Sequence, residues 1–219
     1  YTESNPFSGI APRRSHSARS ERHPFTDDDL RLLFGTALFK EKKYTHDWQY
    51  WLPLLGLYTG ARLEELCQLK VQDFKIADGC HYIDINSNGD IENRVKTPSS
   101  VRKIPIHNEL IRLGLINILG RHSRTSFLFD LRRINTNLGH VPSKWFSAYK
   151  ASLGLPKGTK VFHSFRHTLR DKLTGAGVPS EHIREILGHE QLGETFGRYG
   201  SAIPIDVLKE SIDKMKVPI

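Results

Sequence analysis

The chain has 219 residues, and its 32 Lys and Arg against 24 Asp and Glu give a net charge of +8. This excess of basic residues favours a polyanionic partner, with DNA or RNA the first to test. No apolar run reaches the roughly 18 residues of a membrane-spanning helix, and the two cysteines, Cys67 and Cys80, are too few for a disulfide framework.

Residues 1–23 are rich in serine, proline and arginine and show no hydrophobic period. This composition is typical of a linker or a disordered tail. Because the chain begins with Tyr1 and not with Met, we interpret residues 1–23 as a basic interdomain linker in a longer protein. Residues 24–219 are then expected to form one domain.

A helix is predicted to begin after Thr26, whose side chain can cap it and which precedes three aspartates. Apolar residues continue at helical spacing through Leu30, Leu33, Phe34, Ala37 and Leu38. A second helix is predicted over residues 47–58. Thr59-Gly60 ends that helix, and a third begins near Ala61.

The middle of the chain changes to a strand pattern. Residues 80–85 alternate between polar and apolar side chains, and Asn88-Gly89-Asp90 indicates a turn. Two more strands are predicted over 91–96 and 101–106, joined by a polar hairpin tip. Helical patterns then resume near residues 107–120, 142–153, 163–176, 179–187 and 204–215. The expected fold is mainly α with a small three-stranded antiparallel sheet (α+β).

The segment from His163 to His167 allows two kinds of site. His163 and His167 are four residues apart and could hold a metal from one helix face, but the acidic residue of a metalloprotease helix is missing. His163 and Arg166 also share a face and suit a phosphate group. Solvated polar residues at the start of a helix remain the structural alternative.

Three further residues are candidates for the same chemistry. Arg62 lies in the first turn of the third helix, where Glu65 can orient its guanidinium group. A surface ion pair is the alternative, although the apolar neighbours indicate a helix start in the core, where arginine needs a partner or an anionic ligand.

Gly188 can end a helix and leave His189 on a turn. Tyr199 follows in a polar stretch.

The order of these motifs resembles the tyrosine recombinase (phage integrase) family over roughly residues 24–215. The resemblance rests on four motifs, Thr-Gly-Ala-Arg-Leu-Glu-Glu-Leu, Lys-Thr-Pro-Ser-Ser-Val-Arg-Lys-Ile-Pro-Ile, His-Ser-Phe-Arg-His-Thr and Ile-Leu-Gly-His, followed by Tyr199. It implies that the catalytic residues are Arg62, Lys96, His163, Arg166, His189 and Tyr199. In the implied roles Tyr199 is the nucleophile, Lys96 is the general acid and Glu65 braces Arg62. Lys103 is a second candidate for the acid.

The resemblance implies a site-specific DNA recombinase that cleaves and rejoins strands through a 3′-phosphotyrosyl intermediate. Such a recombinase needs no metal and no cofactor, and its reaction integrates or excises a mobile element. A type IB topoisomerase has a similar site and is the nearest alternative. A basic DNA-binding protein without catalytic activity is the other.

The family also suggests the partners and the setting. Double-stranded DNA is the expected substrate, with self-association into a tetramer on DNA and the helix over 204–215 as the candidate exchange element. We interpret this chain as the catalytic domain alone, without the N-terminal DNA-clamping domain that members of the family generally have. We expect a bacterial or phage-derived protein that acts in the cytoplasm on nucleoid DNA.

Overall fold

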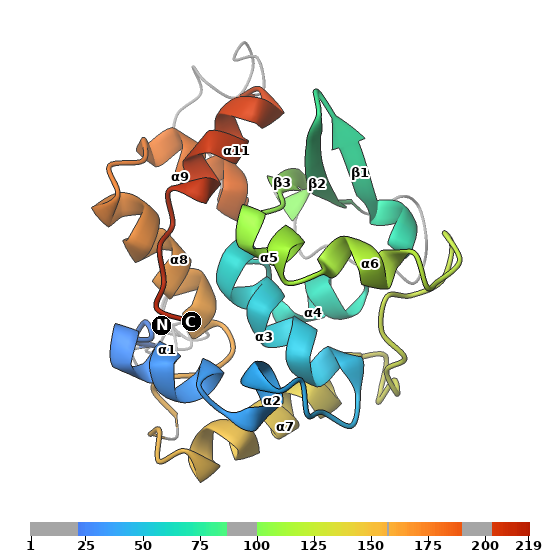
Figure 1. The fold of residues 1–219 in the computed structure, drawn as a ribbon, viewed down its shortest axis with the longest axis vertical. Coiled ribbons are helices and arrows are strands. Elements are labelled where there is room, and N and C mark those ends of the chain that lie inside the picture. Colours follow the sequence, from blue (N-terminus) through green and yellow to red (C-terminus); the bar gives the residue numbers. More distant parts are fainter. Residues whose placement is uncertain (1–21, 87–99, 157, 190–202) are drawn as a thin grey trace, which may run out of the picture.

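Helix α3 runs through the middle of the fold, with the other helices and a small sheet around it (Figure 1). The computed structural model describes residues 22–86, 100–156, 158–189 and 203–219. Its α-helices are α1 (Asp27–Phe34), α2 (Ala37–Lys40), α3 (Asp47–Thr59), α4 (Leu63–Cys67), α5 (Asn108–Arg112), α6 (Leu115–Leu119), α7 (His140–Ser152), α8 (Ser164–Gly175), α9 (Ser180–Leu187) and α11 (Ile205–Asp213). A 3-10 helix spans Val71–Asp73, and the strands are β1 (Phe74–Ala77), β2 (Cys80–Ile85) and β3 (Arg102–Pro105). This confirms the predicted fold class.

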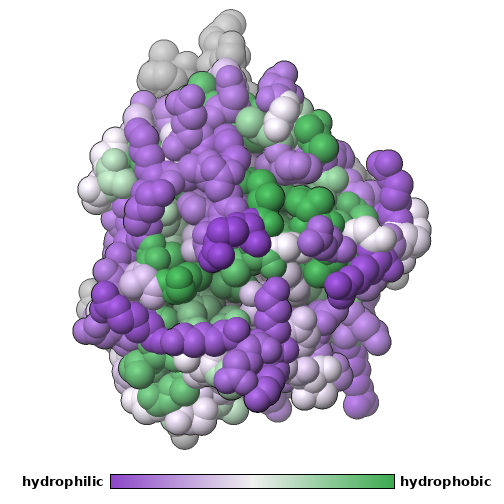
Figure 2. Space-filling view, viewed as in Figure 1, coloured by the Kyte–Doolittle hydropathy of each residue, from purple (hydrophilic) through white to green (hydrophobic). Residues whose placement is uncertain are grey.

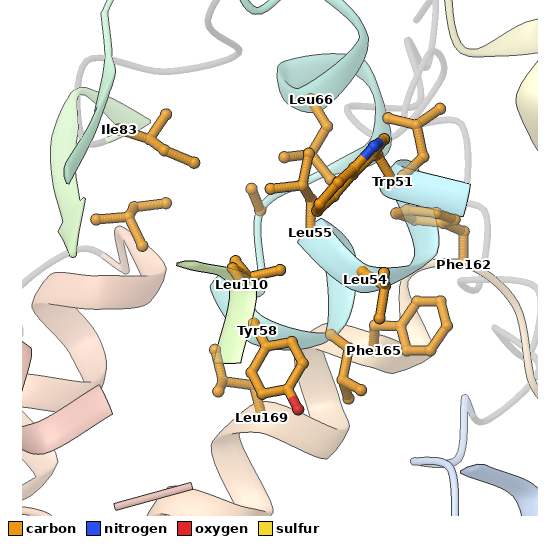
Figure 3. Close-up of a cluster of buried hydrophobic side chains, with 14 of the residues drawn as sticks. Trp51, Leu54, Leu55, Tyr58, Leu66, Ile83, Leu110, Phe162, Phe165 and Leu169 are labelled. Carbon is orange, nitrogen blue, oxygen red and sulfur yellow. The ribbon is translucent and has the colours of Figure 1, made fainter. Parts of the chain in front are cut away.

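Helix α3 is apolar on all of its faces, and such a helix is stable only when other elements surround it. Its side chains from Tyr50 to Thr59 are all buried. Figure 3 shows Leu54 and Tyr58 of α3 beside Phe165 and Leu169 of α8. Each fully buried leucine contributes about 2 kcal/mol. This packing joins the C-terminal end of α3 to the first turns of α8. Candidate site residues lie near both of these ends.

The sheet is antiparallel throughout, in the order β1-β2-β3. Strands β2 and β3 confirm the predictions over 80–85 and 101–106, and Ile83 lies opposite Ile104 in their pairing. The strand predicted over 91–96 lies outside the described residues. The sheet is completed by β1, which was not predicted.

The signal for β1 is the dipeptide Asp78-Gly79, which joins β1 to β2 with both residues at positive φ, 50° and 72°. A two-residue turn of this composition is the strongest local indication of a β-hairpin. It stands directly before the alternating pattern that predicted β2.

Two predicted helices are broken in the structure, so their predicted continuity was wrong. The first is divided into α1 and α2 at Gly35 and Thr36. The helix predicted over 107–120 is divided into α5 and α6 at Gly114, which has a φ of 99°. The apolar period continues across both breaks, so it does not reveal them. The left-handed conformation of Gly114 depends on the path of the chain in three dimensions.

Helix α11 packs against β3 and α9 of its own chain, and the segment after it runs past α8 toward α1 (Figure 1). Asp213 fixes this position, because its Oδ1 accepts a 2.9 Å hydrogen bond from the backbone N–H of Asn108, the first residue of α5. Its Oδ2 accepts from Asn108 Nδ2 at 2.8 Å. The buried apolar side chains of this region are Ile205, Leu208, Ile212 and Met215.

Hydrophilic side chains cover most of the face seen in Figure 2, and apolar residues gather in smaller areas between them. Among the residues that the structure describes, the exposed large apolar side chains are Leu32, Ile76, Val101 and Ile219. No helix in the described segments combines the length and apolar character needed to span a bilayer.

Candidate active site

Gly60 brings the start of α4 against α8 and α9. It ends α3 in the left-handed conformation, with a φ of 62°. A Cβ at this position would lie 2.6 Å from Leu187 Cδ2 and 2.9 Å from Leu169 Cδ2. Glycine is therefore required both by the backbone conformation and by the close approach. The turn places Arg62, the residue before α4, near Arg166, whose Nη1 donates to the carbonyl oxygen of Gly60 at 3.0 Å.

Glu65 is a buried carboxylate that binds Arg62. Its Oε1 accepts from Arg62 Nη1 at 2.6 Å, and its Oε2 accepts from the Arg62 backbone N–H at 2.9 Å. Burial alone would raise the pKa of Glu65, but the charge and hydrogen bonds of Arg102 and the hydrogen bonds of Arg62 hold it below its usual value. Glu65 is therefore ionised at neutral pH, and it fixes a guanidinium group that is 30% exposed.

Arg102 is the second arginine on the same carboxylate, and we did not predict a role for it. Its Nη2 donates to Glu65 Oε2 at 2.9 Å, and its side chain is 1% exposed. Its Nε donates to the Ile186 carbonyl at 2.9 Å and its Nη1 to the Ser100 carbonyl at 2.7 Å. The available signal was an arginine at an inward-facing position of a strand, but two of its three partners, Glu65 and Ile186, are 37 and 84 residues away in the sequence.

Arg166 lies deeper than Arg62. Its side chain is buried, and its Nη2 has no hydrogen-bond partner among the described residues. Burial, with the charges of Arg102 and Arg62, lowers the pKa of Arg166 to about 9, so the group still carries its charge at neutral pH. A buried guanidinium with a free N–H group is suited to bind an anion.

His163 precedes α8 and is half-buried, on the same helix start as Arg166. Burial and the charges of His167 and Arg166 lower the pKa of His163 to about 4. The imidazole is therefore neutral near pH 7 and can accept a proton. The rings of His163 and His167 meet edge to face with centroids 5.1 Å apart. Within the described segments, no group of three or more His, Cys, Asp or Glu residues could hold a metal ion.

His189 lies on the turn after α9, as predicted. Gly188 ends that helix in the left-handed conformation, and the His189 backbone N–H donates to the Arg184 carbonyl at 3.1 Å. Partial desolvation and the charges of Arg166 and Arg62 lower the pKa of His189 to about 4. The shared influence of these two arginines on both histidines indicates that the five predicted residues Arg62, Glu65, His163, Arg166 and His189 lie in one region.

Two predicted site residues, Lys96 and Tyr199, lie outside the described residues. Lys103, the alternative to Lys96, is on β3 and exposed. Its Nζ lies 5.4 Å from the centroid of the Tyr82 ring. Because adjacent side chains of a strand point to opposite faces, Lys103 points away from the face on which Arg102 binds Glu65.

Residues 25–202 match the sequence model described as the phage integrase family. The protein named "Tyrosine recombinase XerC-like" from Caldanaerobacter subterraneus subsp. tengcongensis is 28% identical over 239 aligned positions, which cover 93% of this chain and 58% of that protein. The chain therefore spans less than two thirds of the length of this curated relative.

Solved structures share the fold. The integrase from mycobacterium phage Brujita has a TM-score of 0.61 and 15% identity, covering 91% of this chain and 61% of that chain. The Tn1549 transposon integrase, in complex with circular intermediate DNA, has a TM-score of 0.54 and 20% identity, covering 88% and 67%. At these identities the similarity concerns the fold alone.

Proposed function

The chain belongs to the phage integrase family, and we propose that it is the catalytic part of a site-specific DNA recombinase that works through a 3′-phosphotyrosyl intermediate. The similarity to a XerC-like tyrosine recombinase supports this function. So does the solved complex of the Tn1549 integrase with DNA, because that integrase shares the fold. The proposal implies double-stranded DNA as substrate, in the cytoplasm of a bacterium and on its nucleoid.

The observation that carries the proposal is the arrangement of Arg62 and Arg166. One guanidinium is partly exposed and held by Glu65, and the other is buried with an N–H group that has no partner among the described residues. A DNA phosphodiester resists nucleophilic attack because its oxygens are negative, and attack adds further negative charge to the five-coordinate transition state. Fixed guanidinium groups stabilise that charge without having to reorganise.

The remaining predicted residues account for the bonds that form and break. Tyr199 would attack the phosphorus, so that a phenolic oxygen–phosphorus bond forms and the bond to the 5′ oxygen breaks. His163, neutral at pH 7, is suited to accept the phenolic proton. Lys96 would give a proton to the departing 5′ oxygen. The phosphotyrosyl bond conserves the phosphodiester, so a 5′ hydroxyl from another strand can reverse the step with a new partner.

Covalent trapping tests this function against a DNA-binding protein without catalysis. A pool of randomised nicked duplexes would be incubated with the chain, and adducts that survive denaturation would be recovered and sequenced. We expect adducts to form, and to form equally in excess chelator, because the mechanism uses no metal. Absence of any adduct would favour the binding protein, and strict dependence on a divalent ion would favour a metal site at His163 and His167.

A second assay separates the recombinase from a type IB topoisomerase. Both make the same covalent intermediate, but only a recombinase joins the cleaved end to a different duplex. Duplexes recovered from the trapping experiment would be supplied in two labelled forms. Exchanged joints support a recombinase, and relaxation of supercoils without exchange supports the topoisomerase.

We also propose that the protein assembles as a tetramer on DNA and that α11 is exchanged between protomers. Recombination requires several active sites around two duplexes, and an exchanged helix would couple them. Only the short segment before Pro204 must redirect for α11 to leave its own domain. In the isolated chain α11 packs in cis through its apolar side and through Asp213.

Removing residues 203–219 is therefore expected to weaken assembly on DNA more than it weakens folding of the monomer. The matched variant Asp213→Ala loses the two hydrogen bonds to Asn108 but keeps the apolar face, so it should weaken the packing of α11 on its own domain and leave assembly intact or stronger. Sedimentation with the recovered duplex measures assembly, and thermal unfolding measures stability. If both variants assemble like the parent, or if the truncated monomer does not fold, α11 serves its own domain only.

A further inference from the structure

Arg102 connects three elements of the candidate site. It donates a hydrogen bond to the carboxylate of Glu65, which also orients Arg62. It also binds the carbonyl of Ile186, three residues before His189, and the carbonyl of Ser100 at the end of the segment that carries Lys96. Ser100 Oγ in turn accepts a hydrogen bond from Arg62 Nη1 at 3.2 Å.

Arg102 also contributes to the net charge of the described site. Arg62, Arg102 and Arg166 are positive, Glu65 is negative, and the two histidines are neutral near pH 7. The described part of the site, which does not include Lys96, therefore has a net charge of +2. A phosphodiester has one negative charge, and attack by a phenolate makes the five-coordinate transition state doubly negative. This part of the site thus matches the charge of the transition state better than that of the bound DNA.

We propose that Arg102 is a positioning residue that neutralises Glu65, so that this carboxylate can orient Arg62 without cancelling its charge toward the scissile phosphate. This inference rests on the proposed function. Without Arg102, the single negative charge of Glu65 would oppose Arg62 directly, and the described site would have a net charge of +1. A buried ion pair that contributed only to stability would have no such effect on the reaction.

The substitution Arg102→Met keeps much of the volume and removes the charge. We expect adduct formation on the duplex recovered by trapping to slow on the order of 10²-fold, the lower end for removing one electrostatic contribution from an active site. Arg102→Lys keeps the charge and should retain most of the rate. The control Arg112→Met removes an exposed arginine that pairs with Glu109 away from the site, and it should leave the rate unchanged.

A neutralised substrate separates charge from structure. In a methylphosphonate duplex, one non-bridging oxygen of the scissile phosphate is replaced by a methyl group, which removes one negative charge. The rate difference between the parent chain and Arg102→Met should then largely disappear. An equal loss on both substrates would overturn the proposal, because a disordered site fails regardless of substrate charge.

A double-mutant cycle tests the dependence on Glu65. Glu65→Gln keeps an acceptor for Arg62 but carries no charge to neutralise, so adding Arg102→Met in that background should change the rate little. An equal loss in both backgrounds would contradict the proposal. If Arg102→Met alone does not fold, Arg102→Gln, which removes the charge but keeps hydrogen-bond donors, takes its place in the cycle and in the comparison on the neutralised substrate.

Adduct formation by the parent chain shows whether the proposed function or only the role of Arg102 has failed. If it forms no adduct with any duplex of the pool, the proposed function has failed. If it forms adducts and Arg102→Met does so at the same rate, only the role of Arg102 has failed.

Discussion

Replacing Tyr199 with phenylalanine is expected to abolish the covalent protein–DNA adduct and to leave DNA binding unchanged. The substitution removes only the hydroxyl oxygen that would bond to phosphorus, so no slower route through the same side chain remains. Gel electrophoresis under denaturing conditions measures the adduct, and fluorescence anisotropy with the recovered duplex measures binding. Mass spectrometry of the adduct from the parent chain would identify the modified tyrosine directly.

Two other tyrosines provide matched controls. Tyr58 is buried in the core, and Tyr149 donates its hydroxyl hydrogen to the Leu33 carbonyl. Burial raises the pKa of both phenols, which disfavours the phenolate that attacks phosphorus. Tyr58→Phe and Tyr149→Phe should therefore form the adduct like the parent chain. If Tyr199→Phe still forms it and one of these variants does not, Tyr199 is not the nucleophile.

The fold was predictable where local patterns and tertiary structure agree. The apolar residues of α3 predicted a helix that ends within one residue of its observed end, and Thr26 caps α1 as predicted, in a capping box with Asp29. The misses are of a different kind. Gly114 breaks a helix whose apolar period continues through it, and β1 has too few residues to show an alternation of its own. The break at Gly114 depends on how the chain packs in three dimensions, whereas the Asp78-Gly79 turn was a local signal for β1 that we did not use.

The candidate site was predictable where its residues lie close together in the sequence. Arg62 and Glu65 are three residues apart, as are His163 and Arg166, and short spacing on a helix indicates a shared face. What brings the two pairs together is Gly60, whose carbonyl accepts from Arg166 across 106 residues. Arg102 was missed because its contacts with Glu65 and Ile186, which indicate its role, are of this long-range kind.

Lys96→Ala is expected to slow cleavage of ordinary DNA by about 10²–10⁴-fold, the usual contribution of a general acid. The 5′ oxygen is a poor leaving group unless it receives a proton as its bond to phosphorus breaks. A substrate with sulfur in place of that oxygen departs as a stable thiolate and needs no proton. The rate of Lys96→Ala on the sulfur substrate should therefore return close to that of the parent chain, as measured by adduct formation with both duplexes.

Lys103 is the alternative acid, and the geometry of β3 argues against it. Arg102 and Lys103 are neighbours on one strand, so their side chains point to opposite faces of the sheet. Arg102 is on the face of Glu65, whereas Lys103 is exposed beside Tyr82. Lys103→Ala should accordingly cleave ordinary DNA nearly as fast as the parent chain and gain nothing from sulfur. If sulfur rescues Lys103→Ala and not Lys96→Ala, then Lys103 is the acid, and β3 must rearrange on DNA to bring it to the phosphate.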